Sequence, residues 1–233
     1  MTSTTIQLEA RGIGLQMDNR WLWRELNLSL NKTSFIAVTG SSGAGKTSLL
    51  RCLSGQLSPS EGTIVRSSGT TALIHQDLQL ANGATCLMNA LSGCLGRHSF
   101  LSTLLSFPSE EQTAAKILLD KFGLSGKEKQ WASTLSRGER QRLAICRTLL
   151  AKPVILLADE PVASLDSKWA DRVLKFLRET MVQTGGCLIC SLHDESQVNR
   201  FADQRLHLDS TLPNGWSLQS MGGEVQILSL IHI

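Results

Sequence analysis

Residues 40–47 form a glycine-rich run that ends in a lysine and a hydroxyl side chain, with the sequence Gly-Ser-Ser-Gly-Ala-Gly-Lys-Thr. Glycines at this spacing let the backbone curl so that its N–H groups point at phosphate oxygens. A helix that begins at the end of the run adds partial positive charge there. We therefore expect a nucleotide site, with Lys46 on the β- and γ-phosphates and Thr47 on Mg²⁺. The nucleotide-binding residues predicted from this run are Gly40, Ser41, Ser42, Gly43, Ala44, Gly45, Lys46, Thr47 and Ser48.

Two acidic residues, Asp159 and Glu160, directly follow a short apolar run at 154–158. Such a run predicts a buried strand, and an acid at its end is placed to hold Mg²⁺ through water. We expect Asp159 to have that role and Glu160 to orient or deprotonate the attacking water, which typically changes a rate by about 10²–10⁴-fold. The alternative is an acidic turn after a buried strand, and the phosphate-binding run favours the catalytic interpretation.

The elements around these residues alternate between strand and helix. An apolar run at 35–39 precedes the glycine loop and a helical stretch at 46–53 follows it, which is typical of the start of an α/β unit. No strand pattern is convincing between 78 and about 131, where helices are expected at 86–95 and 110–122. The other expected strands are 5–9, 24–31, 63–66, 71–75, 154–158 and 187–192, and the other expected helices are a helix ending at 150, 168–182 and 195–201.

Composition excludes several classes of protein. The chain has 233 residues, of which 42% are hydrophobic and 18% charged, and its mean hydropathy is −0.01. No apolar run approaches the roughly 20 residues that span a bilayer, so an integral membrane protein is not expected. A net charge of +3 is too small to indicate a nucleic-acid partner. We expect a soluble, cytosolic globular protein with a sizeable core.

The six cysteines are dispersed among aliphatic residues, which predicts buried, reduced thiols rather than a disulfide framework. Cys187 and Cys190 have the spacing of a redox or metal pair. They lie in an apolar run that predicts a strand, where residues three apart point to opposite faces. The structural interpretation is therefore preferred to a metal or redox role.

A third motif, Leu-Ser-Arg-Gly-Glu at 135–139, lies between the first two. With Gln76 after a strand, Ala-Ser-Leu-Asp at 163–166 and His193, it makes the chain resemble the ATP-binding cassette (ABC) family along nearly its whole length. The resemblance implies an α/β fold, a P-loop NTPase (ABC ATPase) core with an N-terminal antiparallel β-lobe and an inserted helical lobe at about 78–136. Residues 1–227 would form this single domain. The run at 228–233 looks unrelated to it, and we expect an artefactual tail there.

The resemblance also implies roles for single residues. Gln76 would sense Mg²⁺ and a transmembrane partner, and His193 would contact the γ-phosphate. Together with Glu160 they form the predicted catalytic set, and the predicted Mg²⁺ set is Thr47, Gln76 and Asp159. Ser136 and Gly138 would cap the γ-phosphate of ATP bound to a second subunit. The implied assembly is a head-to-tail dimer that encloses two ATP molecules, and whether the two subunits are identical is left open.

Two departures from the family pattern stand out. In the motif at 135–139, called the signature from here on, the third and fifth residues are Arg137 and Glu139, where the family has glycine and glutamine. We expect function to survive because Ser136 and Gly138 remain. The chain contains no tyrosine, while the family stacks adenine on an aromatic residue ahead of the second strand. Met17, Trp21 and Trp23 are the candidates for this position, and the simpler alternative is that both tryptophans pack in the β-lobe.

The segments 91–96, 104–108 and 114–124 and the sequence around Asp159 resemble the ATPases of phosphonate importers. This implies an ATP-hydrolysing subunit that works with transmembrane permease subunits and, indirectly, with a periplasmic solute-binding protein. It would lie peripherally on the cytoplasmic face of the bacterial inner membrane. The solute would be phosphonate, phosphite or a related phosphorus oxyanion. An importer of amino acids, a lipoprotein-release system and a soluble ABC ATPase without transport are the alternatives.

Overall fold

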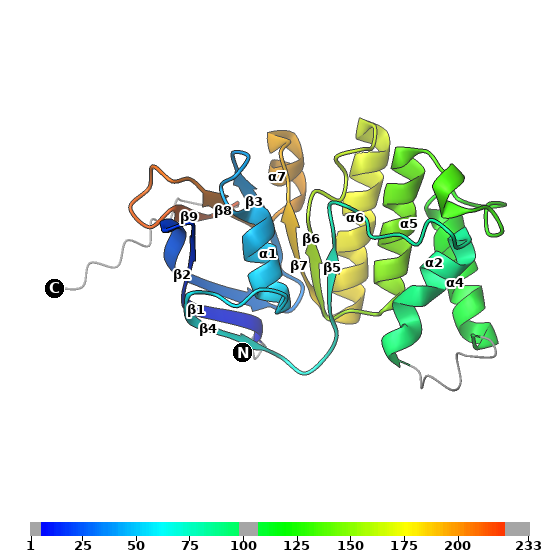
Figure 1. Cartoon of the computed structure of the whole chain (residues 1–233), viewed down its shortest axis with the longest axis horizontal. Coiled ribbons are helices and arrows are strands. Elements are labelled where there is room, and N and C mark those ends of the chain that lie inside the picture. Colours follow the sequence, from blue (N-terminus) through cyan, green and yellow to red (C-terminus); the bar gives the residue numbers. More distant parts are fainter. Residues whose placement is uncertain (1–5, 98–106, 222–233) are drawn as a thin grey trace. The chain divides into compact units, whose positions relative to one another are not determined.

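The computed structural model describes residues 6–97 and 107–221 (Figure 1). Within these residues the chain divides into two compact parts, and each is treated by itself. The first, called the β-rich part, combines residues up to 73 with 154–160 and the chain from 174 onward. The second, called the helical part, combines 74–153 with 161–173. The predicted tail at 228–233 lies outside the described residues.

The β-rich part holds two sheets. A three-stranded antiparallel sheet has the order β2-β1-β4, and a six-stranded sheet has the order β5-β6-β7-β3-β8-β9. Strands β6, β7, β3 and β8 pair in parallel, and β9 pairs antiparallel with β8. The strands are β1 (Ile6–Met17), β2 (Arg20–Asn31), β3 (Phe35–Gly40), β4 (Glu61–Arg66), β5 (Thr71–Ile74), β6 (Ile155–Ala158), β7 (Cys187–Ser191), β8 (Gln204–Leu208) and β9 (Trp216–Ser220). Helices α1 (Lys46–Ser54) and α7 (Glu195–Phe201) belong to this part, as does the second half of α6 (Ser167–Thr184).

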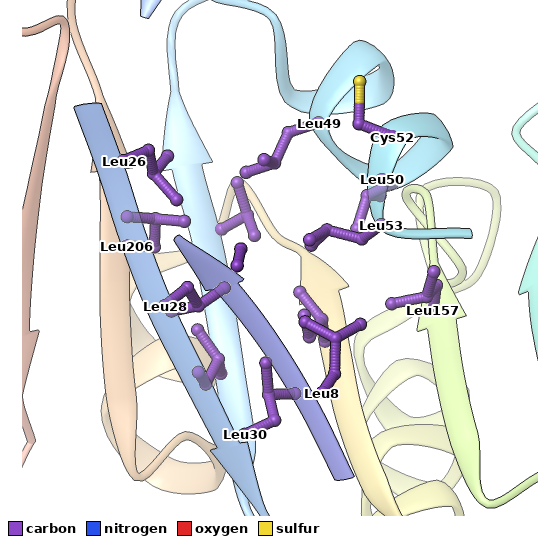
Figure 2. Packing of buried hydrophobic residues seen from close by; sticks show 14 of the residues in the cluster. Leu8, Leu26, Leu28, Leu30, Leu49, Leu50, Cys52, Leu53, Leu157 and Leu206 are labelled. Atoms are coloured by element: carbon purple, nitrogen blue, oxygen red, sulfur yellow. The ribbon is translucent and has the colours of Figure 1, made fainter. Parts of the chain in front are cut away.

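One apolar core joins both sheets to α1. Leu49, Leu50 and Leu53 of α1 are fully buried, and the side chains of β1, β2, β6 and β8 pack in the same cluster (Figure 2). Every residue of β6 and β7 is buried, as expected of parallel strands covered on both faces. Because its core side chains belong to this cluster, α1 and the loop before it have a rigid support.

The helical part packs four helical segments against one another. They are α2 (Cys86–Leu91), α4 (Ser109–Lys121), α5 (Arg137–Leu150) and the 3-10 segment η1 (Ser92–Arg97), with a further 3-10 turn η2 at Ala132–Thr134. Thr85 caps α2 by accepting the N–H of Met88, and buried Asn89 binds the preceding loop through Ala81, Ala84 and Thr85. Of the segment 104–108 used for the subfamily resemblance, only 107 and 108 are described.

Most predicted elements are confirmed, with three corrections. The first two strands are longer than the predicted 5–9 and 24–31, because β1 and β2 form one hairpin whose turn residues, Asp18 and Asn19, both have positive φ. The predicted helix at 86–95 ends as an α-helix at Leu91 and continues as 3-10. Strands β8 and β9 were not predicted at all. All six cysteines are buried and free, as expected.

No helix among the described residues is long and apolar enough to cross a membrane.

Candidate functional site

The glycine-rich run forms a tight loop between β3 and α1 in the β-rich part. Gly40, Gly43 and Gly45 all have positive φ, which favours glycine. A Cβ on Gly40 would lie 2.4 Å from the Leu208 carbonyl oxygen, so a side chain there would collide with β8. Gly45 is the N-cap of α1 and supplies no side-chain hydrogen bond, so the N–H groups of the first turn have no side-chain cap. This is the backbone arrangement that binds anions.

Lys46 stabilises the loop from within. Its Nζ donates to the carbonyl oxygens of Gly40, at 2.8 Å, and Ser41, at 3.0 Å. The residue is 7% exposed, which is unusual for a lysine and places its charge inside the loop. Thr47 and Ser48 are half-buried at the start of α1, and Ser41 and Ser42 are exposed. The loop therefore combines an inward-facing cation with backbone N–H groups, as the sequence predicts for a phosphate site.

Asp159 and Glu160 follow β6 and are held by β7, its neighbour in the sheet. Asp159 is 3% exposed, and its Oδ1 accepts a hydrogen bond of 2.8 Å from the hydroxyl of Ser191. The same hydroxyl accepts the backbone N–H of Glu160, also at 2.8 Å. Ser191 thus fixes both acids at the end of the strand. Sequence reasoning missed it, and the only signal was a polar residue at the end of an otherwise apolar strand.

Glu160 and His193 are in direct contact. His193 Nε2 lies 2.6 Å from Glu160 Oε1, and the two side chains are 55% and 20% exposed. Glu160 has a φ of 49°, in the left-handed region that non-glycine residues rarely adopt. Such a conformation persists only where surrounding contacts hold it, and the hydrogen bond from its N–H to Ser191 is one of them. The residue predicted as the base and the histidine predicted to contact the γ-phosphate are therefore hydrogen-bond partners.

The signature residues lie in the helical part, at the start of α5. Ser136 is the N-cap: its Oγ accepts the N–H of Glu139 over 3.3 Å, and the Glu139 carboxylate accepts the N–H of Ser136 over 2.9 Å. Lys127 Nζ lies 2.5 Å from the same carboxylate. These hydrogen bonds, that of Lys127 foremost, lower the pKa of Glu139 to about 2. A Cβ on Gly138 would lie 3.1 Å from the Ser164 carbonyl oxygen, so glycine allows α5 to approach the 163–166 run.

Gln76 also belongs to the helical part, where it is exposed just after β5. The backbone that follows it has positive φ at Leu78 and Gln79. The Arg147 guanidinium of α5 donates to both of their carbonyl oxygens, over 2.7 and 2.5 Å. Arg147 is thus a second residue that sequence reasoning missed. The predicted set is therefore divided, with the phosphate loop, Asp159, Glu160 and His193 in one part and Gln76, Ser136 and Gly138 in the other.

The three candidates for the adenine position differ in exposure. Trp23 is 1% exposed and packs against the loop, since a Cβ on Gly45 would lie 3.0 Å from its Nε1. The prediction that Trp23 stacks on adenine is therefore wrong, and its side chain packs inside the β-rich part instead. Trp21 is half-buried, with the Arg24 guanidinium 4.3 Å from its ring centre. Met17 is 48% exposed, and its Sδ lies 3.9 Å from the Ser48 hydroxyl beside the loop.

In the β-rich part, the predicted Mg²⁺ ligands are the Thr47 hydroxyl and the Asp159 carboxylate. Oxygen ligands of this kind suit Mg²⁺ rather than a transition metal. Among the described residues there is no group of three or more His, Cys, Asp or Glu side chains that could hold a metal ion alone. A metal at Thr47 and Asp159 would therefore need oxygen atoms from a bound phosphate or water. Cys187 and Cys190 are both fully buried, and burial raises the pKa of each thiol, that of Cys187 to about 12, which argues against a metal or redox role.

Comparisons with known proteins agree with these motifs. A sequence profile described as ABC transporter matches residues 23–163. The chain is 35% identical over 193 residues to the phosphonates import ATP-binding protein PhnC 3 of Nostoc sp. The alignment covers 77% of this chain and 74% of that protein. It is 36% identical over 194 residues to the phosphite import ATP-binding protein PxtA of Stutzerimonas stutzeri, with 78% and 70% covered.

Solved structures show the same fold. A chain of an ABC transporter in an inward-facing conformation has a TM-score of 0.80 and 25% identity, with 93% of this chain and 83% of that chain covered. A dimeric ATP-binding cassette bound to ADP and Pi also has a TM-score of 0.80, at 20% identity, with 93% and 100% covered. At that identity the likeness concerns the fold alone. The predicted fold class and the predicted family resemblance are confirmed.

Proposed function

Because the chain belongs to the ABC transporter family, we propose that it is the ATP-hydrolysing subunit of a membrane importer for phosphonate, phosphite or a related phosphorus oxyanion. The observation that carries the solute class is the identity of 35% and 36% to a phosphonate and a phosphite import protein over more than three quarters of this chain. The similarity of the segment 91–96 to the ATPases of phosphonate importers supports the same solute class. That the chain binds and hydrolyses ATP follows from the family itself.

The proposed binding step uses the phosphate loop. Lys46 and the N–H groups of the first turn of α1 would hold the β- and γ-phosphates, and the hydroxyls of Ser41, Ser42, Thr47 and Ser48 would add hydrogen bonds. Met17 is proposed to lie under the adenine, because it is exposed and in contact with Ser48. A thioether offers less than an aromatic face, which typically contributes about 1–3 kcal/mol to base stacking.

The proposed chemistry is attack of a water on the γ-phosphate. Glu160 would accept the proton of that water, and His193, 2.6 Å from Glu160, would keep the carboxylate oriented and contact the γ-phosphate. Thr47, Asp159 and Gln76 are the proposed Mg²⁺ residues, and the metal when bound would neutralise charge on the phosphate oxygens. The N–H of Glu160 donates to Ser191, so the base is tied to the residue that also holds Asp159.

The proposed assembly is a dimer of ATPase subunits bound to permease subunits on the cytoplasmic face of the bacterial membrane, with a periplasmic binding protein delivering the solute. Ser136 and Gly138 would serve the ATP of the opposite subunit. A phosphate loop on one face leaves the γ-phosphate open, so donors from a second subunit would complete the site. No nucleic-acid partner is proposed. Residues 1–227 are proposed to act as one ATPase domain.

The test is the ATPase rate of the subunit reconstituted in vesicles with the permease and binding protein from the same operon. We expect methylphosphonate or phosphite to raise the ATPase rate. The substitution Lys46→Ala is expected to abolish ATP hydrolysis. A rate unmoved by phosphorus oxyanions but raised by an amino acid would refute the solute class while leaving the ATPase mechanism. No ATP hydrolysis under any condition would refute the proposed chemistry.

A further inference from the structure

A cluster of polar side chains joins the end of β3 to the start of α7. At its centre is Arg205 of β8, whose Nε donates to the Thr39 hydroxyl over 3.0 Å. Its two terminal nitrogens donate to the two carboxylate oxygens of Glu195, over 2.8 and 2.5 Å. Thr39 is only 5% exposed, and the hydroxyl also lies 2.9 Å from Nδ1 of His207. One guanidinium therefore binds a buried hydroxyl and a carboxylate at once.

The two residues that Arg205 joins adjoin two parts of the proposed site. Thr39 immediately precedes Gly40, the first residue of the phosphate loop, whose carbonyl oxygen accepts a hydrogen bond from Lys46. Glu195 follows His193 by two residues, and His193 contacts Glu160. Arg205 therefore provides a side-chain link between the residue before the loop and the histidine segment.

The Leu192 N–H donates to the Val38 carbonyl oxygen over 3.1 Å, so the sheet holds the chain as far as the residue before His193. Helix α7 beyond it is short. It has seven residues, and a helix of that length has little stability of its own in water. Asp194 caps it by accepting the N–H of Ser196 over 2.8 Å, which orders the turn locally but does not attach it to the sheet. A bidentate Arg–carboxylate pair fixes direction as well as distance. The pair with Glu195 therefore orients the start of α7 relative to β3.

We propose that Arg205 is a positioning residue for hydrolysis: through Glu195 and Thr39 it holds the His193 segment in register with the phosphate loop. The inference rests on the proposed function. Arg205 acts on the placement of His193 and Glu160, whereas ATP is held by Lys46 and the loop N–H groups. Its loss therefore lowers kcat for ATP hydrolysis and leaves KM for ATP nearly unchanged.

The experiment is a double-mutant cycle on the reconstituted transporter, with kcat, KM for ATP and melting temperature measured for each protein. Arg205→Gln and Glu195→Gln are each expected to lower kcat about tenfold, since small misplacements of reacting groups cost up to about 100-fold. KM changes less than about twofold, and the double variant is no slower than the slower single variant. Arg205→Lys, which keeps the charge without the planar fork, gives an intermediate kcat.

The matched control is Arg11→Gln, which breaks the ion pair of Arg11 with Glu9 at 2.7 Å on the surface of β1. Its kcat stays at the unchanged protein's value. The inference is overturned by an unchanged kcat in Arg205→Gln, by a rise in KM at constant kcat, or by additive losses in the double variant. If Arg205→Gln does not fold, Arg205→Lys decides by the same criteria. Absence of hydrolysis in the unchanged protein would overturn the proposed function as well, whereas hydrolysis indifferent to Arg205 overturns only this inference.

Discussion

Replacing Ser191 with alanine tests whether β7 holds the predicted metal-binding acid in place. The Ser191 hydroxyl is fully buried, donates to Asp159 Oδ1 over 2.8 Å and accepts the N–H of Glu160 over 2.8 Å. Its removal deprives a buried carboxylate of a hydrogen bond worth about 1.5–3 kcal/mol and a backbone N–H of one worth about 1 kcal/mol. We expect a loss of roughly 3 kcal/mol in the free energy of unfolding, or about 6–12 °C in melting temperature for a chain of this size.

The substitution should also lower activity. Loss of a residue that orients a metal-binding group typically costs about 10–100-fold in metal affinity or activity. We expect the Mg²⁺ concentration for half-maximal ATPase activity to rise by about tenfold and kcat to fall, because Asp159 and Glu160 lose a shared support. The assay is a Mg²⁺ titration of phosphate release at saturating ATP.

The matched control is Thr148→Ala. Thr148 is 6% exposed, and its hydroxyl donates to the backbone carbonyl of Ala144 over 2.9 Å, within α5 of the helical part, whereas the acids belong to the β-rich part. It should lose about 1 kcal/mol in unfolding free energy with no change in the Mg²⁺ requirement. An unchanged Mg²⁺ requirement in Ser191→Ala, with a melting temperature lowered no more than in the control, would refute the reasoning.

Three further predictions use the same purified protein. Glu160→Gln should retain ATP affinity, accumulate as an ATP-bound dimer in sedimentation, and lose at least about 10²-fold in turnover; undiminished phosphate release would exclude Glu160 as the base. Met17→Phe should tighten ATP binding by about fivefold or more, measured by calorimetry, because an aromatic face adds stacking; equal or weaker affinity would mean that adenine lies elsewhere. The pKa of Glu139 is lowered from 4.5 to about 2, so its ionised form stabilises the fold above pH 4.5 and this contribution disappears as pH falls toward 2. The stability difference between the unchanged protein and Glu139→Gln, on the order of 1 kcal/mol at pH 7, should therefore shrink as pH falls below 4.5 and disappear below about pH 2 in acid-unfolding curves, and a constant difference would contradict it.

The phosphate loop could be predicted from the sequence because each of its requirements is local. Positive φ at Gly40, Gly43 and Gly45 and a helix start at Lys46 depend on residue types within one short run. The same holds for the acids after β6, since an apolar run and two carboxylates suffice to place them at a strand end. Local rules were enough where the chemistry requires a particular backbone.

Local rules failed where the partner is distant in sequence. Strand β8 alternates polar and apolar residues but has only five residues, and its place in the sheet depends on pairing with β3, which is distant in sequence. The role of Ser191 likewise depends on the register that sets β7 beside β6, with Ala158 opposite Cys190. The register between β6 and β7 cannot be obtained from periodicity, because a buried parallel strand is apolar on both faces.

The departures in the signature run have a structural explanation in the start of α5. Glu139 is the third helical residue, where its carboxylate accepts the N–H of Ser136 and completes a capping box with the Ser136 hydroxyl. The cap uses that hydroxyl as an acceptor, so its own proton remains able to be donated to a phosphate oxygen. Arg137 is the first residue of the helix, is exposed, and leaves the seryl group in place. An anion approaching Ser136 would also meet the positive end of a 14-residue helix. Glutamate in place of glutamine therefore stabilises the very turn that presents the proposed donor, which is the physical reason to expect hydrolysis to survive both substitutions.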